Sequence, residues 1–106
     1  MMDNLEFQKA NWQRIDEEKR KLLVADLKHW IPFNMMKELR DIAKANFDVP
    51  GFHFSGGMSI RNRLRMTMTD NQLPVVETYP NGEPYGQQNW DDFYMGAILE
   101  VCDDKN

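Results

Sequence analysis

The 106-residue chain has little of what marks secreted, metal-binding or membrane-spanning proteins. Its single cysteine, Cys102, cannot form an internal disulfide, which excludes a small disulfide scaffold. Its two histidines, His29 and His53, lie 24 residues apart and lack the spacing of zinc ligands. No apolar run approaches the roughly 20 residues that cross a bilayer, and the N-terminal residues lack the basic-then-apolar pattern of a signal peptide. We therefore expect a cytoplasmic protein that needs no metal, no cofactor and no membrane.

Recognisable catalytic motifs are also missing. The glycine pair at 56–57 belongs neither to a Gly-x-Ser-x-Gly sequence nor to a phosphate-binding loop with Gly-Lys-Ser/Thr. Asp91 and Asp92 are adjacent, so on a helix they point about 100° apart and cannot share one acid–base site. We expect them in the first turn of a helix, where negative charge is favourable. These absences favour a non-enzymatic protein. The alternative is an uncharacterised enzyme with a pocket around His53, Arg61, Asn62 and Asp92.

The chain has no excess of positive charge, because 13 basic side chains face 17 acidic ones and the net charge is −4. This balance disfavours a general nucleic-acid coat. The charge is unevenly distributed: residues 1–50 are neutral, residues 51–69 carry +3 and residues 70–106 carry −7. We expect the middle segment to pair with the acidic C-terminal third. The alternative is a basic face that binds nucleic acid through three arginines, Arg61, Arg63 and Arg65.

The composition, 42% hydrophobic and 28% charged, is typical of a globular protein, and the length fits a single domain over 1–106. Apolar residues recur at helical spacing in three segments, 4–31, 34–46 and 89–101. A break near Gln13 or Asp16 is possible, and Pro32 ends the first segment. The core-facing residues expected in that segment are Leu5, Trp12, Ile15, Leu22, Leu23 and Trp30. We expect Asn34 and Asn89 as N-caps, and the buried face expected after Asn89 is Trp90, Phe93, Tyr94, Ala97, Ile98 and Val101.

The stretch between these segments predicts less regular structure. We expect a short helix over about 55–64, followed by extended chain through Thr69. Three prolines and two glycines interrupt residues 70–88, where 73–79 favours an edge strand and 79–82 a β-turn. The sequence thus predicts a small, mainly α domain of three to four helices with a short extended or hairpin segment near 64–80. An α+β fold is the alternative.

Two motifs carry a resemblance to a known family. His-Phe-Ser-Gly-Gly-Met-Ser-Ile-Arg-Asn at 53–62 resembles the His-Phe-x-x-Gly-Met-x-Ile-Arg-Asn stretch of a small bacterial and phage family classified as a domain of unknown function. Residues 91–99 resemble its Asp-Asp-x5-Ile-Leu helix. The resemblance covers about 34–101 and leaves 1–33 as an N-terminal helical extension. It implies a mainly helical fold and no defined activity. It also implies a structural polar signature of His53, Gly57, Arg61, Asn62 and Asp92, beside Asp91.

Taken with this resemblance, the sequence predicts a non-enzymatic protein-interaction module, a phage or bacterial accessory protein that acts as an inhibitor or adaptor of a protein partner. Aromatic and arginine side chains are enriched at interface cores. The residues expected to contact a partner are Arg63, Arg65, Tyr79, Tyr85 and Trp90.

Overall fold

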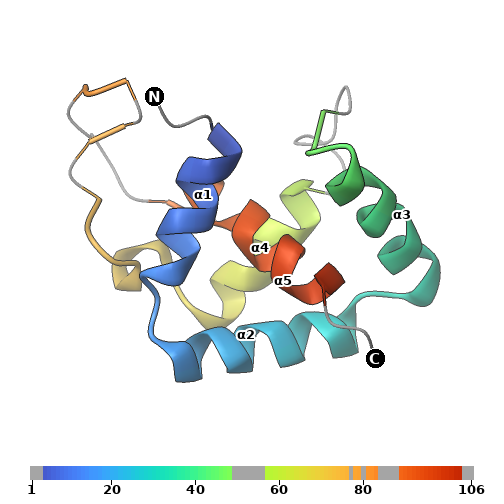
Figure 1. Cartoon of the computed structure of the whole chain (residues 1–106). Coiled ribbons are helices and arrows are strands. Elements are labelled where there is room, and N and C mark those ends of the chain that lie inside the picture. Colours follow the sequence, from blue (N-terminus) through green and yellow to red (C-terminus); the bar gives the residue numbers. More distant parts are fainter. Residues whose placement is uncertain (1–3, 49–56, 77, 80, 84–88, 104–106) are drawn as a thin grey trace.

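The computed structural model describes residues 4–48, 57–76, 78–79, 81–83 and 89–103 (Figure 1). This part of the chain folds into an all-α globule that contains five α-helices and no strand. The α-helices are α1 (Asn4–Gln13), α2 (Glu17–Trp30), α3 (Phe33–Lys44), α4 (Met58–Thr67) and α5 (Tyr94–Asp103). Two 3₁₀ helices, η2 (Asp70–Gln72) and η3 (Trp90–Asp92), complete the described secondary structure. No helix in these ranges is both long and apolar enough to cross a membrane.

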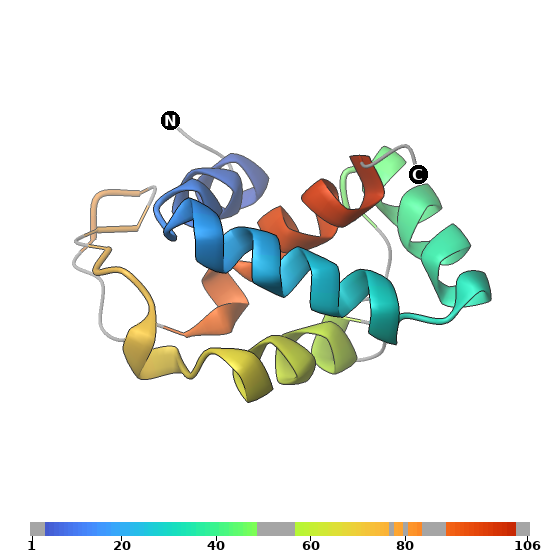
Figure 2. The same cartoon turned by 90° about the horizontal axis from the view of Figure 1, so that it is seen from below.

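The C-terminal helix α5 lies at the centre of the fold (Figure 1). Helices α1, α2 and α3 all pack against it, and α4 packs against α2 and η3. Figure 2 shows that α2 and α4 lie side by side and run in opposite directions. The expected buried face of the last segment is confirmed, because all six of its residues are in the core. A helix that is apolar around most of its circumference suits this central place.

The expected helix over 4–31 is two helices, which makes the predicted total of three to four too low. The break at residues 14–16 lies where the sequence allowed one, with Asp16 at the N-cap of α2, although its side chain makes no capping hydrogen bond. The break changes the direction and rotation of the second helix. Leu23 is therefore buried as expected, whereas Leu22 is 67% exposed and does not belong to the core.

Two further helix boundaries differ from the prediction. The third helix begins at Phe33 with Pro32 as its N-cap, so Asn34 is not the cap. Proline suits this place because its extended backbone leads into the helix and it has no N–H group to leave unpaired. The fourth helix continues to Thr67 instead of ending near residue 64.

Apolar residues alternate with arginine and threonine after Ile60, yet the chain becomes extended only at Met68 and Thr69, beyond the end of α4. Ile60, Leu64 and Met68 recur every four residues, and all three are buried. Helical spacing brings these side chains to one face, and that face contributes to the core. The competing period of two is also present in the sequence, but burial of the four-residue repeat decides the structure.

Of the edge strand and the β-turn predicted after α4, only the turn forms in the described residues. No strand forms in the described residues of 73–79, although Leu73 and Val76 are buried as single anchors. The predicted turn is confirmed, since Gly82 N–H donates to Tyr79 O at 2.9 Å and Tyr79 N–H donates to Glu83 O at 2.9 Å. Gly82 has φ +88°, a backbone conformation that glycine adopts without strain. The described chain is thus all-α and not α+β.

Helices α1 and α5 approach each other closely at Gly96. A Cβ atom at this position would overlap Trp12 Cβ and lie 2.8 Å from Trp12 Cγ. The absence of a side chain is what lets the buried Trp12 ring fit against α5.

We predict that Gly96→Ala destabilises the protein, although the same change in an open helix stabilises it by about 1 kcal/mol. Forcing the two helices apart costs about 1–3 kcal/mol, which corresponds to a melting temperature lower by roughly 5–15 °C. Thermal denaturation followed by circular dichroism measures the change. Ser59→Ala, on the exposed side of α4, is the control with an almost unchanged melt. A higher melting temperature for Gly96→Ala would contradict the close packing of Trp12 against α5 at Gly96.

Candidate functional site

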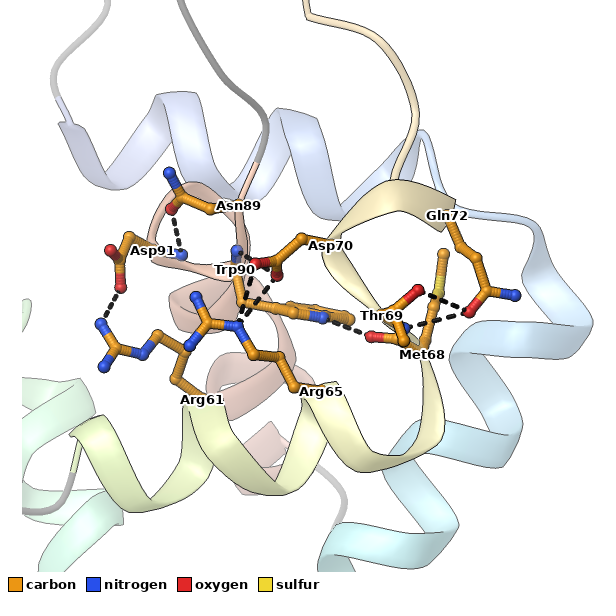
Figure 3. Close-up of polar contacts among 9 residues, drawn as sticks. All are labelled: Arg61, Arg65, Met68, Thr69, Asp70, Gln72, Asn89, Trp90 and Asp91. Atoms are coloured by element: carbon orange, nitrogen blue, oxygen red, sulfur yellow. Dashed lines mark hydrogen bonds and ion pairs between the residues drawn. The ribbon is translucent and has the colours of Figure 1, made fainter.

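Polar side chains from α4, η2 and η3 meet around Trp90 (Figure 3). We call Arg61, Arg65, Asp70 and Asp91 the arginine network. Arg61 and Arg65 are one turn apart, so both point to the same side of α4. Arg61 Nη1 donates a hydrogen bond to Asp91 Oδ1. Arg65 Nε lies 3.0 Å and 3.1 Å from the two carboxylate oxygens of Asp70. The network therefore ties both 3₁₀ turns to the same helix.

Trp90 lies at the centre of this network and is fully buried, with 0% of its surface exposed. Its indole Nε1 donates to Met68 O at 2.7 Å, and its backbone N–H donates to Asp70 Oδ1 at 3.3 Å. The sequence predicts both a buried place and a partner contact for Trp90. Its burial is confirmed, and complete burial leaves no surface for the predicted contact. A tryptophan whose N–H finds a backbone carbonyl can be buried completely, and this carbonyl is supplied where α4 ends.

The turns on either side of the network have their own local caps. The predicted cap at Asn89 is confirmed, because its side-chain oxygen accepts from Asp91 N–H at 2.8 Å. It caps η3, however, and not α5, which begins four residues beyond Trp90. Gln72 Oε1 accepts from both the N–H and the hydroxyl of Thr69, at 3.0 Å and 3.1 Å. These local bonds hold the backbone that presents the acidic partners to the arginines.

Arg63 points away from the network, because two residues along a helix correspond to a rotation of about 200°. Its guanidinium makes a bidentate pair with Asp26 of α2, with donor–acceptor distances of 2.8 Å and 2.9 Å. The same group lies 5.5 Å from the centre of the Trp30 ring, within cation–π range. The hydrogen bond from Arg63 is the main reason why the pKa of Asp26 lies below its usual value, and burial opposes the shift.

All three arginines thus pair with carboxylates, which was the expected arrangement. The C-terminal third supplies the partner for Arg61 and Arg65, but Arg63 pairs with α2, so the expectation about the source of its partner is wrong. Phosphates would have to displace these carboxylates to reach the arginines. Binding of nucleic acid through this triplet stays a prediction, and the ion pairs argue against it.

The other predicted residues that the structure describes do not converge on a pocket. Gly57 is buried directly before α4, and Asn62 is exposed on α4. The backbone carbonyl of Asp92 accepts a hydrogen bond from Asn11 Nδ2 at 3.0 Å. Tyr79 is partly exposed, with its ring centre 6.2 Å from that of Phe7. His53 and Tyr85 lie outside the described residues. Within the described ranges, no three side chains of the metal-binding types form a group.

Comparisons with protein-family models, with curated proteins and with solved structures found no match to this chain. The resemblance of residues 53–62 and 91–99 to the small bacterial and phage family therefore stays a prediction.

Two polar residues that the sequence analysis missed hold the start of α5. Gln8 and Asn11 are buried on α1. Gln8 Oε1 accepts from Met95 N–H at 2.9 Å, although 87 positions separate the two residues. A signal was present, since Gln8 lies at helical spacing between two expected core residues, Leu5 and Trp12. A polar side chain inside an apolar stripe indicates a buried hydrogen bond.

The arrangement around Trp90 is suited to holding backbone segments together. Its charged groups are paired with one another, and four of its other hydrogen bonds involve backbone atoms of the adjoining turns and the end of α4. The arginine network therefore acts as a clamp between α4 and the two 3₁₀ turns, and we assign it a structural role.

We predict that Arg61→Ala lowers the stability by about 1–2 kcal/mol, or the melting temperature by roughly 5–10 °C. The change removes the hydrogen bond between Arg61 and Asp91 and opens the edge of the Trp90 site. The effect is moderate because Arg61 Nε is buried with no hydrogen-bond partner in the described chain, unlike the bidentate Arg63. Thermal denaturation tests this, with the neighbouring exposed Asn62→Ala as the matched control. Equal melts for the two variants would refute the clamp.

The raised pKa of Tyr94 predicts that the protein loses stability at alkaline pH. Burial raises the pKa of its phenol to about 12, with a smaller increase from Asp91 and an opposing effect of Arg61. The folded protein therefore holds this proton more tightly than the unfolded chain, whose tyrosine pKa is about 10. The stabilisation is complete below pH 10 and falls by up to about 3 kcal/mol as the pH rises through 12.

Absorbance titration of the phenolates, compared with Tyr94→Phe, should isolate one component with a pKa of about 12. Urea denaturation of wild type at pH 9 and pH 11.5 should show the accompanying loss of stability. Identical alkaline titrations for wild type and Tyr94→Phe, after allowing for one fewer tyrosine, would rule the assignment out.

Proposed function

We propose that the chain is a non-enzymatic protein-interaction module, an inhibitor or adaptor that docks through the surface between α2 and α4. The observation that supports this proposal is a pair of exposed apolar side chains. Leu22 is 67% exposed and Met66 is 76% exposed. We call the surface formed by Leu22, Asp26, Arg63 and Met66 the α2–α4 face.

The ion pair between Asp26 and Arg63 brings these two side chains to one side. Leu22 lies one turn before Asp26, and Met66 lies about one turn after Arg63. Helices α2 and α4 run in opposite directions (Figure 2). The step back from Asp26 to Leu22 and the step forward from Arg63 to Met66 therefore lead toward the same end of the helix pair. The apolar pair and the ion pair thus form one continuous surface.

This surface has the composition of an interface core. Methionine and arginine are enriched there, and methionine adapts to partners of different shape. The guanidinium of Arg63 is already held by Asp26 and stacked on Trp30, so binding would cost little side-chain entropy. Leu22 and Met66 contribute little to the core of the monomer, so a partner that covers them gains the full benefit of burying their apolar area.

The resemblance to phage and bacterial proteins supports the more specific reading as an accessory protein. The nucleic-acid alternative gains less support, because its arginines are paired with carboxylates. The enzyme alternative includes His53, which lies outside the described ranges, and stays a prediction.

We predict that the double variant Leu22→Ser, Met66→Gln reduces capture of the partner by at least tenfold, since interface cores concentrate binding energy in few residues. Quantitative affinity capture from the native host compares wild type, the double variant and Val75→Ser. Val75 is a similarly exposed apolar residue on another segment and serves as the matched control. Circular dichroism checks that all three are folded.

Proteins retained by wild type and Val75→Ser but lost by the double variant support the proposal. If every captured protein binds the double variant as well as wild type, or if nothing is captured, the α2–α4 face is not a docking surface.

A further inference from the structure

Helix α3 lies at the edge of the molecule and packs mainly against α5 (Figure 1). Leu39 is its one fully buried residue, whereas Met36 and Ala43 are half-buried beside α5. Most of the surface of this helix is therefore available to another molecule.

The outer surface of α3 carries a line of three cations that begins at an aromatic residue. Spacings of four, three and four residues place the members of this line within an arc of about 60°. Phe33, at its start, is 86% exposed, and the three basic residues are exposed as well. We call this line the α3 stripe, and it consists of Phe33, Lys37, Arg40 and Lys44.

The cations of the α3 stripe differ from the arginines of α4 in making no ion pair within the described ranges. Arg61, Arg63 and Arg65 each pair with an aspartate. In the described part of the chain, no ion pair involves a member of the α3 stripe. Their charge is thus available for an external anion.

A cleft of about 300 Å³ between α3 and α5 adjoins the α3 stripe. Arg40 and Lys44 form its basic side, and Ala43, Leu99 and Cys102 give it apolar lining. Burial raises the pKa of the Cys102 thiol, so this part of the lining is uncharged at neutral pH. The cleft therefore accepts apolar groups directly beside a row of positive charge.

We propose that the α3 stripe and this cleft bind an acidic amphipathic segment of a partner protein. Its carboxylates pair with Lys37, Arg40 and Lys44, and its apolar side chains enter the cleft and cover Phe33. The stripe rises about 16 Å along α3, which equals about three turns of a bound helix. This surface is separate from the α2–α4 face and extends the proposed function to a second class of contact.

Charge argues for an acidic peptide over the other anionic macromolecules. Asp103 lines the same cleft. Glu38 and Asp41 lie on one side of the stripe, about 140° and 80° around the helix from Phe33. Uniformly charged phosphate backbones would meet these carboxylates, whereas a peptide can place its acids opposite the cations alone. Three cations are also fewer than the four to eight of a typical basic segment that binds anionic lipid.

Fluorescence anisotropy tests the proposal with a labelled 14-residue peptide of glutamate and leucine in an amphipathic helical pattern. Wild type should bind it, more weakly as the salt concentration rises. The triple variant Lys37→Gln, Arg40→Gln, Lys44→Gln should bind about tenfold more weakly, since three exposed pairs contribute modestly each. Phe33→Ser should weaken binding several-fold. The matched control, Lys9→Gln, Lys19→Gln, Lys21→Gln, has the same net charge as the triple variant and should bind within twofold of wild type.

Three comparison ligands decide between the occupants: the same peptide with glutamine for glutamate, a 15-nucleotide oligo(dT), and vesicles with 30% phosphatidylserine. Failure of the acidic peptide to bind, or equal binding of the glutamine peptide, would overturn the proposal. An equal loss of affinity in the triple variant of the α3 stripe and in the triple-lysine control would also overturn it. Tighter stripe-dependent binding of oligo(dT) or vesicles would overturn it in favour of that ligand. Leu22→Ser, Met66→Gln should leave peptide binding intact, which separates this proposal from the α2–α4 face.

Discussion

The burial of Trp90 against the end of α4 is the constraint on which the remaining structure depends. The indole reaches full burial because Met68 O accepts its N–H, and that carbonyl is available because α4 ends at Thr67. The ring then packs on Trp12 and Phe93, with ring centres 6.4 Å and 6.0 Å away. One polar contact thus links the middle of the chain, the first helix and the central helix in a single core.

The charges divide between internal and external use according to helix geometry. An alternation of arginines would form one basic face on a strand, but on α4 it sends Arg61 and Arg65 to one side and Arg63 to the other. Each side meets a carboxylate brought by a different segment. The cations of α3 lie on one line at the molecular edge, where they make no ion pair with the described chain. The clustered arginines of α4 are therefore neutralised by carboxylates, whereas the more widely spaced cations of the α3 stripe remain available to an external anion.

Both proposed surfaces lie on helices whose inner faces are held rigidly. The α2–α4 face is organised by the Asp26–Arg63 pair, and the α3 stripe is held on α5 through Leu39 and its half-buried neighbours. Such surfaces need little reorganisation on binding, which favours affinity. They differ in chemistry, because one is apolar around a closed ion pair and the other is cationic beside an apolar cleft. An adaptor that joins two partners needs this kind of separation.

Local pattern and composition by themselves determined the helical class, the cap at Asn89, the turn over 79–82 and the buried face of the last helix, and they allowed a break before α2. Each depends on neighbours within a few residues, through helical periodicity or turn chemistry. Only the tertiary structure decided that α4 continues past Leu64, that the Trp90 indole donates to Met68 O and that Arg63 pairs with Asp26. The physical reason is that these outcomes depend on partners 20 to 40 positions away, such as Met68 for Trp90 and Asp26 for Arg63, which local spacing cannot select.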